Sequence, residues 1–153
     1  MASWINPVYD RTQADVEYAK GQIRQFKANG GITDGVNLKG CFNDSDINRI
    51  ENNSRYLRDE LAKLYYFCDI STTHTWSIWS VPNNQQIDRI INNVKKLQSA
   101  YYTPENSPEL PETISHYEDA NFIEKCLYLL KTMIDDMVSR FRECGDGLEC
   151  GED

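Results

Sequence analysis

The sequence lacks long apolar runs and is short of basic residues. Its longest uninterrupted apolar stretch is a handful of residues, far below the ~20 that a helix needs to span a bilayer. Only 16 Lys and Arg stand against 24 Asp and Glu, which gives a formal net charge of -8. Clustered Lys and Arg drive binding to phosphate groups, so this balance disfavours nucleic acid and anionic membranes as partners.

Signals for secretion and metal binding are also missing. Residues 1–7 contain neither a basic stretch nor an apolar one, so we expect no secretory signal. The five cysteines are an odd number and widely spaced, which favours reduced thiols. Cys144 and Cys150 are the only close pair, but a zinc site usually uses a shorter C-x2-C hairpin and two further ligands. We therefore expect no metal ion and no cofactor.

No motif for catalysis is recognisable. His74 and His116, the two histidines, do not lie in a G-x-S-x-G, H-E-x-x-H or Cys-His context. No glycine-rich phosphate loop separates a strand from a helix. The carboxylates of residues 44–60 fall mainly on the polar side of one predicted helix, where solvent exposure is ordinary. The sequence thus predicts that the chain is not an enzyme.

The sequence does contain four helical segments, separated by residues that typically start or end a helix. Thr12 and Asp15 form a capping-box pattern, and Asn43 and Asn83 are expected N-caps because Asp or Gln follows each of them three positions later. Between the third and fourth segments, residues 102–115 hold three prolines and should form a loop. The expected helical segments are 12–29, 43–66, 83–101 and 115–142. Residues 70–81 are compatible with one extended piece, which cannot form a sheet alone.

The most informative feature is an internal repeat. A shift of 40 positions superposes Asn, Ile, Arg, Ile, Asn and Leu of the second segment on the same residue types in the third, and a shift of 73 superposes Asn, Ile, Glu and Leu on the fourth. The repeated spacing gives each helix a narrow apolar stripe that should form the core. The stripe residues are Ile47, Ile50, Leu57, Ile87, Ile90, Leu97, Ile123 and Leu130. Capping explains Asn43 and Asn83, but core packing does not explain the other shared Asn and Arg positions.

These patterns predict an all-α fold. We expect a bundle of four main helices, three of them variants of one helical motif, connected by irregular aromatic loops. Because amphipathic helices need each other to bury their stripes, residues 1–143 should form a single helical domain. Residues 144–153 should form a short acidic tail that contains Gly and Cys.

Aromatic residues concentrate in the loops and at the helix ends. One interpretation is that these rings plug the ends of the bundle. The other is that they anchor a partner, since Trp and Tyr are enriched in interfaces. The candidate contact residues are Trp76, Trp79, Tyr101 and Tyr102.

Three stretches of the sequence carry a family resemblance. The first is Asn6-Pro-Val-Tyr-Asp-Arg-Thr-Gln-Ala-Asp-Val-Glu-Tyr-Ala. The second is Leu38-Lys-Gly-Cys-Phe-Asn-Asp-Ser-Asp-Ile-Asn-Arg-Ile-Glu-Asn-Asn, close to the pattern L-K-G-x-(L/Y)-N-x-x-D-L-N-R-I-E-x-N. The third, Asp119-Ala-Asn-Phe-Ile-Glu-Lys, matches D-A-N-x-I-E-K. With these motifs the sequence resembles small proteins encoded in the structural gene clusters of phages and prophages of Gram-positive gut bacteria. The sequence departs from the family at residues 83–86, where Asn-Asn-Gln-Gln replaces an acidic and aromatic run.

This resemblance implies a virion protein of the tail or baseplate, made in the bacterial host cytoplasm and without assigned catalytic residues. It implies partners among other tail or baseplate proteins, and a homo-oligomer in the particle. Two other functions stay open on the sequence. One is a tail-tip binding module for a cell-surface glycan or receptor, and the other is a small acidic protein that blocks a host enzyme.

Overall fold

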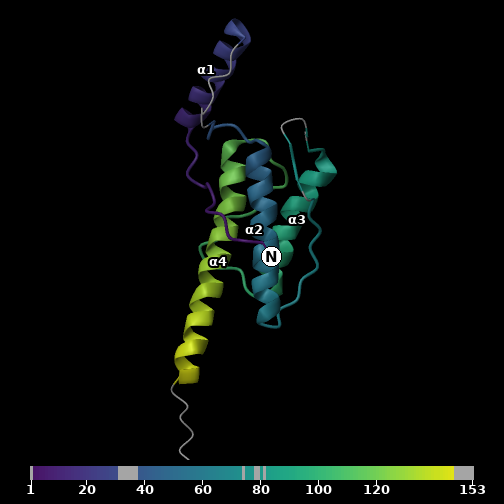
Figure 1. Cartoon of the computed structure of the whole chain (residues 1–153), viewed down its shortest axis with the longest axis vertical. Helices are drawn as coiled ribbons and strands as arrows, with labels where there is room; N and C mark the ends of the chain where they lie inside the picture. Colours follow the sequence, from purple (N-terminus) through teal and green to yellow (C-terminus); the bar gives the residue numbers. More distant parts are fainter. Residues whose placement is uncertain (1, 31–37, 74, 78–79, 81, 147–153) are drawn as a thin grey trace, which may run out of the picture.

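The computed structural model describes residues 2–30, 38–73, 75–77, 80 and 82–146, and this part of the chain is helical without strands (Figure 1). Its helices are α1 (Gln13–Asn29), α2 (Asp44–Lys63), α3 (Asn84–Ala100) and α4 (Tyr117–Asp146). The predicted all-α fold is therefore confirmed. The sequence placed the end of the last helix near residue 142, whereas α4 continues to Asp146, inside the predicted tail.

The starts of three helices follow from local capping. Thr12, Asn43 and Asn83 are the N-caps of α1, α2 and α3, and each forms a complete capping box with the side chain three positions later. In such a box two backbone N–H groups that lack helical partners are satisfied reciprocally. At its other end α1 stops at Gly30, whose φ of 68° is the left-handed conformation that glycine adopts without strain.

Helices α2, α3 and α4 pack against one another and run in the same direction (Figure 1). The connection after α2 and the connection after α3 each return along the bundle to the end where the helices start. Tyr66 and Tyr101, which follow α2 and α3, meet edge to face with ring centroids 4.7 Å apart. The residues described between 70 and 81 lie in the first returning connection and form no regular secondary structure.

The core lies between these three helices. The predicted stripe residues contribute to it, each at most 2% exposed except Ile87, which is partly buried. The fully buried members of the stripe are Ile47, Ile50, Leu57, Ile90, Leu97, Ile123 and Leu130. Burial of this kind stabilises a fold by about 1.5–3 kcal/mol for each large aliphatic side chain.

Helix α1 does not share this core, although the sequence predicted that all four stripes pack together. It projects from the end of the bundle at which the other helices start (Figure 1). Ala19 is its buried residue, while Ile23 and Phe26 on the same stripe are 37% and 42% exposed. The expectation failed because an apolar periodicity identifies a face of a helix but not what covers that face.

Within the described residues, the base of α1 makes a close contact with the segment before α2. The backbone at Gly40 crosses its first turn so closely that a Cβ there would lie 2.2 Å from the carbonyl oxygen of Asp15. Beside this crossing, the Lys39 ammonium lies 2.9 Å from the Asp10 carboxylate. A side chain at position 40 would therefore force the two segments apart.

The end of α2 carries a conformational penalty that can be removed. Tyr65 has a φ of 64°, and the N–H groups of Tyr65 and Tyr66 donate to the carbonyls of Ala62 and Leu61, which is the Schellman pattern. The Tyr65 side chain is 85% exposed. We expect Tyr65→Gly to stabilise the fold by about 1 kcal/mol in thermal denaturation, because glycine adopts this conformation freely. The Tyr65→Ala control keeps the penalty, so equal melting temperatures for the two variants would contradict this explanation.

Candidate functional site

Two extended segments, one before α1 and one after α2, lie against the helices and are held by their backbones. Asn53 of α2 donates from Nδ2 to the carbonyl of Ile5 (2.7 Å) and accepts at Oδ1 from the Ile5 N–H (3.0 Å). Asn93 of α3 makes the same two bonds with Ser71 (2.6 and 3.2 Å). Asn53 and Asn93 are the pair that the 40-residue shift superposes. One side-chain amide thus satisfies both backbone groups of a residue that has no strand partner.

A second pair of asparagines repeats this arrangement further along each segment. Asn48 of α2 donates to the carbonyl of Trp76 (2.9 Å) and accepts from its N–H (2.8 Å). Asn121 of α4 does the same with Arg11 (3.0 and 3.2 Å). These two asparagines are related by the 73-residue shift. We call each set of side chains that holds one segment a backbone clamp.

A buried glutamate completes each clamp between its two asparagines. Glu124 of α4 accepts from the N–H of Val8 (2.8 Å), and Glu51 of α2 accepts from the N–H of Thr73 (2.7 Å). The two residues are 0% and 2% exposed. They too are related by the 73-residue shift, so the same helix position serves the same purpose twice.

An arginine from the neighbouring helix neutralises each glutamate. Arg49 of α2 binds both carboxylate oxygens of Glu124, at 2.7 Å each, and Arg89 of α3 binds Glu51. Such charge-assisted bonds are about twice as strong as neutral ones. The repeated Asn, Arg and Glu positions, which core packing does not explain, are therefore the parts of two equivalent clamps.

The first clamp contains a buried cluster of four charges. The guanidinium of Arg11, with its side chain 1% exposed, lies 2.7 Å from Asp46 and 2.9 Å from Glu124. Arg49 binds the same two carboxylates. Burial alone would lower the pKa of Arg49, but its bonds to Glu124 and then to Asp46 outweigh this and raise it above the usual range. Two cations and two anions thus neutralise each other at this site.

A third connection lies against α4 with a weaker version of the same contact. The thiol of Cys126, at the position that a 73-residue shift superposes on Asn53, donates to the carbonyl of Pro108 (3.4 Å). Burial raises the pKa of Cys126 to about 11, so this thiol keeps its proton at neutral pH.

The predicted contact residues fall in different places. Trp76 is 4% exposed and belongs to the core, so its ring is not on the surface, and contact of these residues with a partner stays a prediction. The reason for its burial is that Trp76 has the same position in the second clamp as Arg11 has in the first, and both side chains face inward. Trp79 lies outside the described residues. Tyr102 is exposed (56%), and Tyr101 is partly buried beside the core.

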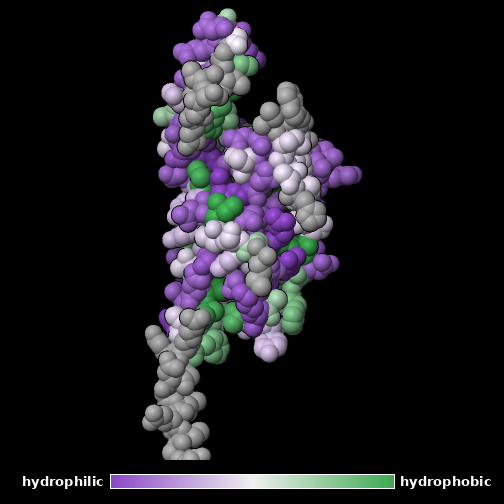
Figure 2. All heavy atoms as spheres, in the orientation of Figure 1, coloured by the Kyte–Doolittle hydropathy of each residue, from purple (hydrophilic) through white to green (hydrophobic). Residues whose placement is uncertain are grey.

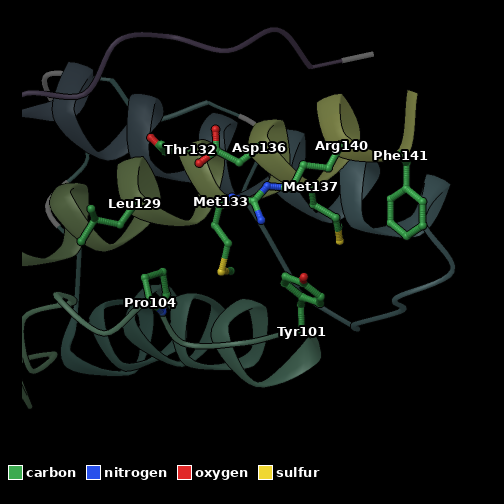
Figure 3. A pocket seen from close by; sticks show the side chains of 9 residues that line it. All are labelled: Tyr101, Pro104, Leu129, Thr132, Met133, Asp136, Met137, Arg140 and Phe141. Atoms are coloured by element: carbon green, nitrogen blue, oxygen red, sulfur yellow. The ribbon is translucent and has the colours of Figure 1, made fainter. Parts of the chain in front are cut away.

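Tyr101 opens onto an apolar groove of about 610 Å³ that runs along the second half of α4. Met133 and Met137 point from α4 toward Tyr101 and Pro104, and Phe141 continues the row (Figure 3). The other residues of the lining are Leu129, Thr132, Asp136 and Arg140. Because α4 extends past the ends of α2 and α3, the outer part of this groove has no neighbouring helix (Figure 1).

Among the described ranges, no three or more His, Cys, Asp and Glu side chains come together in a way that could hold a metal ion. The side chains of Cys144 and Cys150 lie outside what the structure describes. Of the helices described, none is long and apolar enough to cross a membrane.

Comparison with protein-family models, with curated proteins and with solved structures finds no match to this chain.

Proposed function

We propose that the chain is a structural protein that acts by protein–protein assembly, as a tail or baseplate component of a virion. The observation that carries the assembly part is the position of its exposed apolar side chains. Most of them lie on α1 or at the opposite end of the bundle, whereas Ile5, Phe122 and Tyr128 are exposed between the two ends. On the face that Figure 2 shows, the surface between the ends is mostly hydrophilic, with a small apolar patch in its middle. The virion part rests on the resemblance of residues 6–19, 38–53 and 119–125 to phage structural proteins.

Large exposed aromatic residues come from three separate parts of the chain near the ends of α2, α3 and α4. Tyr65 and Phe67 follow α2, Tyr102 follows α3, and Phe141 lies near the end of α4, with exposures between 56% and 85%. Large aromatic side chains on a surface are typical of the centre of a binding interface. Exposed apolar side chains that group on a surface mark interaction sites in soluble proteins.

The backbone clamps favour the same function. They hold the segment before α1 and the connection after α2 against the helices through the backbone, so these segments are ordered before any partner arrives. A surface that is already ordered loses less conformational entropy on binding. A tail-tip module for a glycan needs exposed, coplanar rings, and the buried position of Trp76 removes one of those that the sequence offered.

The test of this proposal is the composition of the particle. Virions from the strain that encodes the chain are purified on a density gradient, treated with protease-free nuclease and analysed by mass spectrometry. We expect the chain at a constant ratio to the major tail protein across gradient fractions, and a deletion of its gene to give particles with an altered tail. Particles that lack the chain and a deletion that leaves the tail unchanged would overturn the proposal.

A further inference from the structure

We infer that the chain assembles head to tail, with α1 of one copy bound in the apolar groove along α4 of the next copy. The inference deepens the proposed function, on which it rests, by naming a second copy of this chain as the partner. Two complementary surfaces on one molecule carry it.

The first surface is the apolar stripe of α1. Val16, Ala19, Ile23 and Phe26 follow one another at intervals of three, four and three residues, the spacing of a helix that packs along a second helix. Ile23 and Phe26, on the half of α1 away from the bundle, are 37% and 42% exposed. The outer half of the stripe therefore presents two apolar side chains to the outside, whereas Ala19 on its inner half is buried.

The second surface is the groove. Leu129, Met133, Met137 and Phe141 lie four residues apart, which places them in one row along α4 (Figure 3). Such a row with a flanking wall, here Tyr101, receives an amphipathic helix in known helix-in-groove complexes. Methionine side chains adapt readily to the shape of an incoming apolar face.

The charges of the two surfaces are complementary. From Lys20 to the end of α1 the sequence has three basic residues and no acidic residue. From Asp135 to Asp146, the end of α4, it has four acidic and two basic residues, and the groove lining contains Asp136 and Arg140. Opposite charges attract these two ends of the molecule, whereas two copies of either end repel one another. This favours α1 against α4 over contacts between like helices.

The two surfaces lie at opposite ends of the molecule, so one copy cannot join its own α1 to its own groove (Figure 1). A contact between two different surfaces is heterologous, and repeating it produces a ring or a filament rather than a closed dimer. In a filament, only the two terminal copies would keep an unbound surface: α1 is free in one of them and the groove is free in the other.

Sedimentation velocity of the full chain over a range of concentrations tests the inference. The α1 variant is Ile23→Asp with Phe26→Asp, and the α4 variant is Met137→Asp with Phe141→Asp. We expect the wild type to form oligomers that grow with concentration, and each variant alone to stay monomeric, with its affinity lowered at least about 100-fold. An equimolar mixture should form a one-to-one dimer and nothing larger, because each variant keeps the surface that the other has lost.

Matched controls carry the same charge away from the proposed contact. Gln25→Asp lies on the other side of α1, and Phe122→Asp replaces an exposed ring of α4 outside the groove; both should assemble like the wild type. Thermal melts check that all variants fold. Dimers of one variant alone would overturn the inference in favour of a contact between like surfaces. A wild type that stays monomeric at every concentration would also overturn it. The proposed function is tested separately, by the mass-spectrometric composition of the particle.

Discussion

Replacing Glu124 by glutamine should lower the free energy of unfolding by about 3–5 kcal/mol. The carboxylate is fully buried and binds two guanidinium groups, those of Arg11 and Arg49, besides the N–H of Val8. Glutamine has nearly the same shape, but it removes one of two negative charges from a cluster that holds two positive ones. The buried excess of positive charge is what destabilises the variant. Urea denaturation followed by circular dichroism measures the change.

The matched control is the same substitution in the second clamp. Glu51 has the equivalent position and accepts the equivalent backbone bond, but it binds a single arginine, Arg89, whose side chain is 22% exposed. Water near Arg89 screens the charge that Glu51→Gln leaves behind, so this variant should lose clearly less stability than the Glu124 variant. Equal losses would show that the backbone bond, and not the charge cluster, determines the effect.

Truncation of the core stripe should have the second large effect. Leu130 is 0% exposed and Ile50 is 1% exposed, both between the three packed helices. Leu130→Ala or Ile50→Ala should each cost about 2–5 kcal/mol, through lost burial and the cavity that remains. The same truncation at Ile87, a member of the predicted stripe that is only partly buried, should cost less. Unfolding curves in urea measure all three changes, and an Ile87 variant as unstable as the others would contradict this order.

The parts of the fold that local chemistry determines could be predicted from the sequence. Thr12, Asn43 and Asn83 cap their helices through side chains three positions away, and such a pattern is visible in any sequence. The stripes of α2, α3 and α4 were visible for a similar reason, because a period near 3.6 identifies the buried face of a helix.

The arrangement of the helices depends on longer distances and could not be predicted. The connections after α2 and α3 are long enough to join either parallel or antiparallel helices, so their length does not fix the direction. The burial of Trp76 depends on Asn48, which lies 28 positions earlier in the chain. No local pattern contains that information.

The clamps could be predicted only in part. The repeat already superposed Asn53 on Asn93 and Glu51 on Glu124, which was a signal of a shared purpose. That these residues bind backbone segments could not be predicted, because the bound segments have no periodicity and offer their backbone groups to the clamp asparagines and glutamates. Arg11 gave no signal, since it does not belong to the repeated set, and Asp46 was recognisable only as the capping partner of Asn43.

The first clamp also constrains the order in which the molecule can form. Val8 and Arg11 are bonded to residues that lie 110 to 116 positions later in the chain. Residues 5–11 therefore cannot complete their contacts until α4, which is synthesised more than 100 residues later, is present. During translation α2 and α3 can already associate, while the α2 surface that packs against α4 stays uncovered. Completion of the first clamp is thus coupled to the synthesis of α4.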